Sequence, residues 1–190
     1  MMSLVIAVDR EEEGLARTLA CLVPAVAEGV LRDAVVLDTG GAEATAAIAD
    51  AAGCHHIVGE PHTHLGNVAE LASAEWLLML KPGVILEHDW FREAAEFGER
   101  AEAMGQKKNL CAAFSYSSQR FGLMARIEEA WRFIAANLLG RVVESQGLIV
   151  ARDTVRRISG SRSGVSGIPP RPPTGSRLVV LRAKAHAPDV

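Results

Sequence analysis

The stretch Glu75-Trp-Leu-Leu-Met-Leu-Lys-Pro-Gly-Val84 joins five consecutive apolar side chains to a short polar turn. An apolar run of this length is typical of a strand that is buried on both faces of a sheet. Lys81, Pro82 and Gly83 follow directly, and proline and glycine favour a turn at that point. The stretch therefore predicts a buried strand whose carboxyl end opens into a turn.

Similar apolar runs recur along the chain, with helix-like segments between them. Leu15, Leu19, Leu22 and Val26 are spaced like one face of a helix, which Pro24 is expected to kink or end. Strands are predicted at 3–8, 34–38, 54–58, 75–80, 109–116 and 147–151, and helices near 15–26, 44–51, 66–74, 87–104 and 122–139. This alternation predicts a Rossmann-like α/β fold, with a mostly parallel sheet covered by helices on both faces.

The composition fits a single packed domain. Of the 190 residues, 49% are hydrophobic and only 23% are charged, which is enough apolar material for one core and argues against a disordered chain. The α/β domain is predicted over residues 1–158. A basic loop rich in Gly, Ser and Pro follows over 159–176, and 177–190 are expected to supply a final strand and the C-terminal tail.

Basic residues gather near the C-terminal end, where residues 145–190 hold eight Lys and Arg against two Asp and Glu. The same segment has no Phe, Trp or Tyr on which bases could stack, so nucleic acid is the least favoured partner. Phosphates, acidic lipid headgroups and the protein's own acidic face remain as alternatives.

Cysteine usage and hydropathy indicate the compartment. Cys21, Cys54 and Cys111 lack the spacing of a metal motif and are expected to be reduced thiols. No apolar stretch approaches the roughly 18 to 20 residues that cross a bilayer, so no transmembrane segment is expected. The predicted location is cytoplasmic, with peripheral contact at the inner face of the membrane as an alternative.

Four segments between residues 3 and 150 carry a resemblance to a known family. They are Val5-Ile-Ala-Val-Asp-Arg-Glu-Glu-Glu-Gly-Leu15, Val35-Val-Leu-Asp-Thr-Gly-Gly-Ala-Glu-Ala-Thr45, Gly66-Asn67 with Glu75 to Leu80, and Ser145-Gln-Gly-Leu-Ile-Val150. In this order they resemble the family 2 glycosyltransferases with a GT-A fold. The resemblance implies a nucleotide-sugar donor, with a UDP-linked sugar as one candidate, and transfer of the sugar to a hydroxyl acceptor.

The resemblance also implies which residues bind the nucleotide. Asp38 falls on the base-binding aspartate and Glu43 on a second acid, while Arg10 and Glu11 lie in the opening turn and Gly83 in the metal motif. Asp38 also has a logic of its own, because an acid before a Gly-Gly turn can accept a hydrogen bond from a base or a ribose hydroxyl. The alternative is that Asp38 caps the turn or the helix that follows.

The family's metal-binding aspartate is absent from the turn after Leu80, which makes a Mg²⁺ or Mn²⁺ cofactor doubtful because hard cations need oxygen ligands. No cofactor is firmly predicted. Lys81 is a candidate to neutralise the leaving diphosphate, and Glu144 is a candidate base for the acceptor. The alternatives are that Lys81 is an ordinary surface lysine and that Glu144 is a solvated acid. A catalytically inactive relative that acts as a binding or interaction module is the alternative function.

Two further features leave alternatives open. Cys54, His55, His56, His62 and His64 fall within 11 positions, and a metal site, an anion contact and ordinary packing are all compatible with them. The predicted helix at 122–139 has an apolar face that suits either packing on the sheet or a membrane surface.

Overall fold

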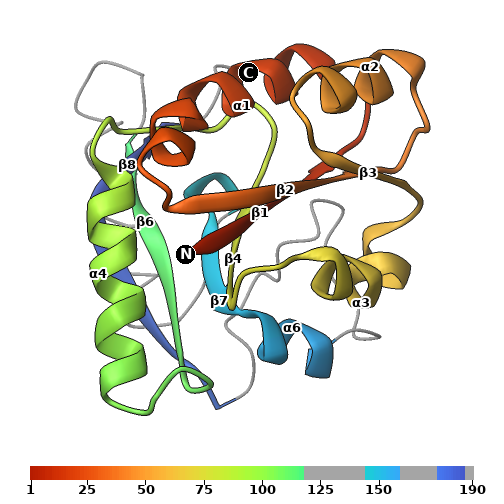
Figure 1. The fold of residues 1–190 in the computed structure, drawn as a ribbon. Coiled ribbons are helices and arrows are strands. Elements are labelled where there is room, and N and C mark those ends of the chain that lie inside the picture. The colour runs from red at the N-terminus through yellow and green to blue at the C-terminus, as the bar shows by residue number, and fades with distance from the viewer. Residues whose placement is uncertain (118–143, 159–174, 187–190) are drawn as a thin grey trace, which may run out of the picture.

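The computed structural model describes residues 1–117, 144–158 and 175–186, which form one mixed sheet with helices on both sides (Figure 1). The strand order is β3-β2-β1-β4-β7-β6-β8-β5. The strands span β1 Met2–Val8, β2 Leu31–Asp38, β3 His55–Val58, β4 Trp76–Leu80, β5 Ile85–Leu86, β6 Leu110–Ser117, β7 Leu148–Ala151 and β8 Arg177–His186. The predicted Rossmann-like α/β fold is therefore confirmed.

The sheet has a parallel half and a mixed half. Strands β3, β2, β1 and β4 are all parallel to one another. Strand β7 then runs antiparallel to β4 and to β6, and β8 is parallel to β6 and antiparallel to the two-residue β5. The carboxyl ends of β1 to β4 consequently meet at one edge, which is where ligands bind in open parallel sheets.

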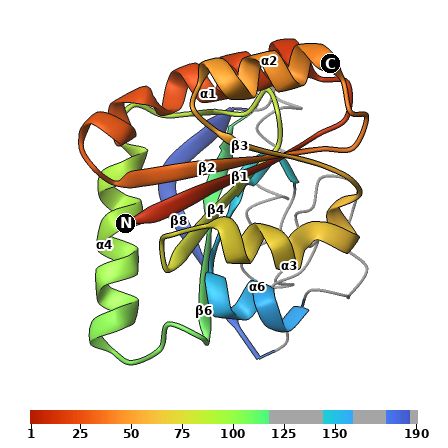
Figure 2. The same ribbon diagram turned by 45° about the vertical axis from the view of Figure 1, so that its right-hand side comes forward.

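Helices cover both faces of the parallel half, as Figures 1 and 2 show: α1 and α2 lie on one side, and α3 and α6 on the other. Helix α4 runs alongside β6 and β8. The bounds are α1 Glu12–Ala27, α2 Glu43–Ala51, α3 Pro61–Leu71, α4 Trp90–Ala103 and α6 Arg152–Ile158, with a 3-10 turn, η1, at Glu144–Gln146. None of these helices is long and apolar enough to span a membrane.

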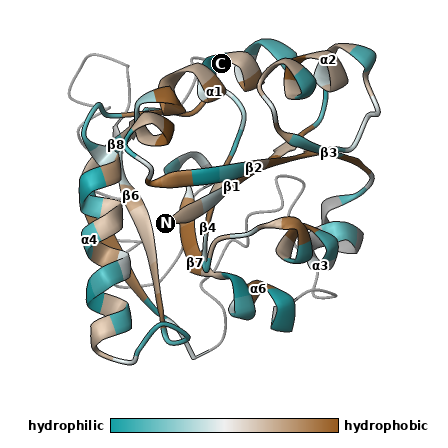
Figure 3. Ribbon diagram, viewed as in Figure 1, coloured by the Kyte–Doolittle hydropathy of each residue, from teal (hydrophilic) through white to brown (hydrophobic). Residues whose placement is uncertain are grey.

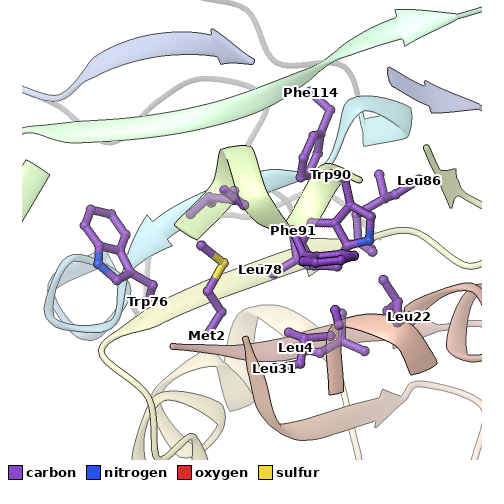
Figure 4. Close-up of a cluster of buried hydrophobic side chains, with 14 of the residues drawn as sticks. Met2, Leu4, Leu22, Leu31, Trp76, Leu78, Leu86, Trp90, Phe91 and Phe114 are labelled. Carbon is purple, nitrogen blue, oxygen red and sulfur yellow. The ribbon is translucent and has the colours of Figure 1, made fainter. Parts of the chain in front are cut away.

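The core consists of two apolar clusters, one on each face of the sheet. Every residue of β1 is buried, and alternate side chains of the strand belong to opposite clusters, which explains why its sequence is continuously apolar. Figure 4 shows the larger cluster, in which Trp90 packs edge-on to Phe114 with ring centroids 5.8 Å apart. In Figure 3 the strands at the centre are mainly apolar, whereas α4 carries many polar residues.

Helix α1 does not end at Pro24, which was one of the two predicted outcomes, but continues to Ala27. Proline removes one amide donor, and that loss is tolerated because Pro24 lies in the last turns of the helix. The buried face is Leu15, Thr18, Leu22 and Ala25, and the side chain of Val26 is 58% exposed.

Other elements match the sequence with adjusted limits. Helix α3 begins at Pro61, earlier than predicted, since proline suits the first position of a helix. The final strand is confirmed as β8. Strand β5 and helix α6 were not predicted, because two and seven residues are too short to show a periodic pattern. The helix predicted at 122–139 lies outside the described residues, as do all but the last two residues of the basic loop predicted at 159–176.

Candidate functional site

The carboxyl edge of the parallel strands brings four loops together, formed by residues 9–11, 39–42, 59–60 and 81–84 and called here the edge loops. Backbone hydrogen bonds connect them to their neighbours. The amide of Thr39 donates to Val8 O at 2.9 Å, and the amide of Gly59 donates to Asp38 O at 2.9 Å. The edge loops therefore lie together around the carboxyl end of the parallel strands.

Asp38 lies at this end of the strands but not on the surface, since its side chain is 0% exposed. Its Oδ1 accepts hydrogen bonds from the amides of Gly40 at 3.0 Å and Gly41 at 2.9 Å. Its Oδ2 is 3.2 Å from Nε2 of His56. Both carboxylate oxygens are thus engaged within the protein, and Asp38 fixes the shape of the turn between β2 and α2.

His56 connects the turn to the edge strand β3. Its side chain is 23% exposed, and it shares a sheet face with Asp38 because the two strands pair in parallel, with Asp38 opposite Val58. The ring of His64 lies over Gly59, and its Nδ1 is 3.1 Å from Glu60 O. Within the described part of the chain, no three His, Cys, Asp or Glu side chains come close enough to hold a metal ion. The side chain of His62 is not among those described.

Arg10 has an unusual backbone conformation. Its φ is 58°, and it is the sole non-glycine residue with positive φ in the described ranges. Such a conformation costs roughly 1–2 kcal/mol and persists only where the surroundings enforce it. The Arg10 side chain is exposed, and its Cγ lies 3.8 Å from the position that a Cβ on Gly40 would take. The strained residue therefore places its side chain beside the Gly40–Gly41 turn.

The turn after β4 presents an ammonium group at the same edge. Lys81 Nζ lies 3.7 Å from Glu11 Oε1, and both side chains are about 40% exposed. Gly83 has a φ of 83°, which favours glycine, and its amide donates to Gly14 O at 3.0 Å. No residue from Lys81 to Gly83 carries a side-chain oxygen, so this turn does not fit a divalent cation.

The remaining predicted residues are placed as follows. Glu43 lies in the first turn of α2 and is exposed, where an acid suits the helix dipole. Glu144 begins η1, but its side chain is not described. Sequence reasoning missed the pairing of His56 with Asp38, because the register of β3 against β2 leaves no local signal.

A separate apolar hollow lies at the opposite end of the parallel strands. It has a volume of about 530 Å³ and is lined mainly by α1, the start of β2 and the chain after α2, including Leu19, Val23 and Leu31. Arg32 and Asp33 are the charged residues among its otherwise mainly apolar lining. The edge loops remain the candidate site because they lie at the carboxyl ends of the parallel strands, where ligands bind in such sheets.

Comparison with known proteins agrees with this geometry. No protein-family model and no curated protein sequence matches the chain. Solved structures do match, including glucosyl-3-phosphoglycerate synthase from Mycobacterium tuberculosis in complex with Mn²⁺ and UDP-glucose. That match has a TM-score of 0.54 and 17% identity, covering 81% of this chain and 57% of that one. Another crystal structure of the M. tuberculosis synthase gives a TM-score of 0.56 at 13% identity, covering 100% of this chain and 72% of the other.

The chain has a GT-A glycosyltransferase fold. It spans 57% of the length of the synthase chain in the complex with Mn²⁺ and UDP-glucose. The structural similarity, with TM-scores of 0.54 and 0.56, establishes the fold. The sequence identities of 13–18% are too low to establish an activity, which has to be argued from the site.

Proposed function

We propose that this protein binds a nucleotide-sugar at the edge loops and transfers the sugar to a hydroxyl acceptor. The observation that carries the proposal is the Gly40–Gly41 turn, which Asp38 holds rigidly at the carboxyl end of β2 in a GT-A fold. Neither glycine has a side chain, so a ligand can approach the backbone closely. A similar fold in the M. tuberculosis synthase binds UDP-glucose, which supports a nucleotide-sugar as the ligand.

The roles of the individual residues follow from their positions. Asp38 acts as a positioning residue for the turn and for His56, while the exposed Arg10 and Glu43 flank the turn and contact the nucleotide. Gly83 sets the shape of the turn that carries Lys81, and Glu11 pairs with Lys81 at 3.7 Å.

In the transfer itself, the acceptor hydroxyl attacks the anomeric carbon, and the bond from that carbon to the diphosphate oxygen breaks. The nucleoside diphosphate leaves with the electron pair. Glu144 is the candidate to take the proton of the hydroxyl, since such a transfer needs a base near the acceptor.

Binding can be tested by thermal unfolding with UDP, GDP and dTDP. A ligand at 100 times its Kd adds about 2.7 kcal/mol of stability. For a domain of this size that corresponds to a rise in Tm of about 5–10 °C. We expect one of the three nucleotides to produce such a shift. No shift with any of them, in the presence or absence of Mn²⁺, would rule out the proposed function.

A variant that blocks the turn shows whether the shift comes from this site. Gly40 has negative or extended φ, and a Cβ there would make only ordinary contacts at 3.8–3.9 Å, so Gly40→Leu should fold. It should nevertheless abolish the shift because the added side chain occupies the approach to the turn. Ala47→Leu, which adds a similar side chain at an exposed position of α2, is the matched control.

The second candidate function is a catalytically inactive relative that binds a ligand or partner without transfer. It is favoured by the turn Lys81–Gly83, which lacks the carboxylate of the family motif. Release of UDP from UDP-glucose in the presence of candidate acceptors separates the two functions. A protein that binds UDP with a Tm shift but never releases UDP from UDP-glucose would be such a binding module.

A further inference from the structure

The turn Lys81–Gly83 is attached to α1 at three successive levels. Glu11 approaches Lys81 at 3.7 Å, Gly14 O accepts from the Gly83 amide at 3.0 Å, and Thr18 Oγ1 donates to Val84 O at 3.0 Å. Gly14 and Thr18 are four residues apart on one side of α1, and Glu11 immediately precedes its first residue. The start of α1 therefore dictates where the turn lies and where the Lys81 side chain begins.

The turn has little freedom to adopt another shape. A Cβ on Gly14 would lie 2.9 Å from the Gly83 nitrogen and 3.2 Å from the Pro82 carbonyl carbon, so the two backbones are in direct contact. Thr18 is fully buried, and the Val84 amide donates to Lys81 O at 3.2 Å. Gly83 also has a backbone conformation that side chains rarely adopt. The backbone at Gly83 therefore favours glycine at a position that falls in the metal-binding motif of the resembled family.

Lys81 is the charged group that this turn offers instead. Its ion pair with Glu11 joins two partly exposed side chains, and pairs of that kind contribute little to stability. A diphosphate, with several negative charges and strong acceptor oxygens, can therefore displace Glu11 from the ammonium group at small cost. A divalent cation, in contrast, would find no side-chain oxygen ligand in the turn and would be repelled by Lys81.

We propose that Lys81 binds the diphosphate of the donor directly, so that donor binding does not require a divalent cation. The inference rests on the proposed function, because it assigns the diphosphate part of the same site. Arg10 supplies a second positive charge in the neighbouring edge loop, on the residue just before Glu11. Fixed positive charge at the leaving group would also stabilise the anion that forms during transfer.

The test is calorimetric titration of the full chain with the nucleoside diphosphate that stabilises it, in EDTA and in Mn²⁺. We expect Kd values within about twofold of each other in the two conditions. Lys81→Ala should weaken binding about tenfold or more in EDTA, since a charge-assisted contact is lost, whereas Lys81→Arg should retain most of the affinity. Glu11→Gln should bind at least as tightly as the wild type, because it frees Lys81 from its partner.

Lys108→Ala is the matched control. Lys108 is exposed and lies just before β6, at the opposite end of the sheet, so its removal changes the net charge equally and should leave the Kd unchanged. Far-UV circular dichroism and Tm verify that each variant is folded.

The outcomes separate this inference from the proposed function. Binding that appears only with Mn²⁺, or a Lys81→Ala variant that binds as tightly as the wild type, overturns the role of Lys81 and leaves nucleotide-sugar binding intact. The absence of binding by UDP, GDP and dTDP in both EDTA and Mn²⁺ overturns the proposed function and this inference with it.

Discussion

Asp38 is expected to be essential to the fold of the edge loops, and its replacement tests that reasoning quantitatively. The carboxylate is fully buried and accepts the amides of Gly40 and Gly41 at 3.0 and 2.9 Å, with His56 Nε2 at 3.2 Å. Asp38→Ala removes all three interactions. Each interaction contributes about 1 kcal/mol net, because the exposed glycines and the partly exposed histidine can hydrogen-bond to water once the carboxylate is gone. The free energy of unfolding should therefore fall by about 3 kcal/mol.

Asp38→Asn should cost less, about 1–2 kcal/mol. The remaining oxygen can still accept the two glycine amides, but the new amide group can only donate, so the His56 ring must place its acceptor at Nε2 to keep this contact. The coupling to His56 can be isolated in a double-mutant cycle with His56→Ala, where an interaction energy of about 1 kcal/mol is expected.

Urea-induced unfolding monitored by circular dichroism gives the free energies. Asp50→Asn, at an exposed position near the end of α2, is the control and should change stability by less than about 0.5 kcal/mol. The reasoning would be refuted if Asp38→Ala were as stable as the wild type but bound no nucleotide. That result would mean that the carboxylate contacts a ligand and does not stabilise the turn.

Two further predictions concern the core and the edge of the sheet. Burial raises the pKa of the Cys111 thiol to about 12, so the thiol stays protonated at pH 8. It should therefore resist a thiol reagent in the native protein and react once urea is added, whereas rapid labelling of all three cysteines in the folded state would contradict this. Glu93 on α4 accepts hydrogen bonds from the backbone amides of Arg182 at 2.9 Å and Ala183 at 2.8 Å. Glu93→Gln should therefore lower the free energy of unfolding by about 1–2 kcal/mol and speed hydrogen exchange at those two amides, while unchanged exchange would show that the carboxylate does not hold β8.

Much of the fold could be predicted because the relevant signals are local. The apolar run from Trp76 to Leu80 identified β4, and the alternation of strands and helices identified the α/β class. The helix limits were less accurate. Helix α3, for example, was predicted near 66–74 but spans Pro61–Leu71, because the proline that begins it is a weaker signal than a periodic apolar pattern.

The candidate site was predictable as a set of loops but not as a set of contacts. The acids after β1, the Asp38 turn and the Lys81 turn each follow a predicted strand, and parallel strands bring such loops together at their carboxyl edge. That Asp38 points into the protein toward His56 could not be deduced, because it depends on how β3 is aligned with β2. The role of Gly14 also required the structure, as its contact with Gly83 joins residues far apart in the chain.

The class of fold, the order of most elements and the absence of a carboxylate between Lys81 and Gly83 can all be read from the amino-acid sequence. These properties depend on side-chain type and on the local period of the apolar pattern. The three-dimensional structure was needed to establish that β7 enters the sheet antiparallel to β4, that β8 pairs with β6, and that α1 contacts the Lys81 turn. Those outcomes depend on the summed packing of distant segments, because a periodic pattern specifies which face of an element is buried and not which partner will cover it.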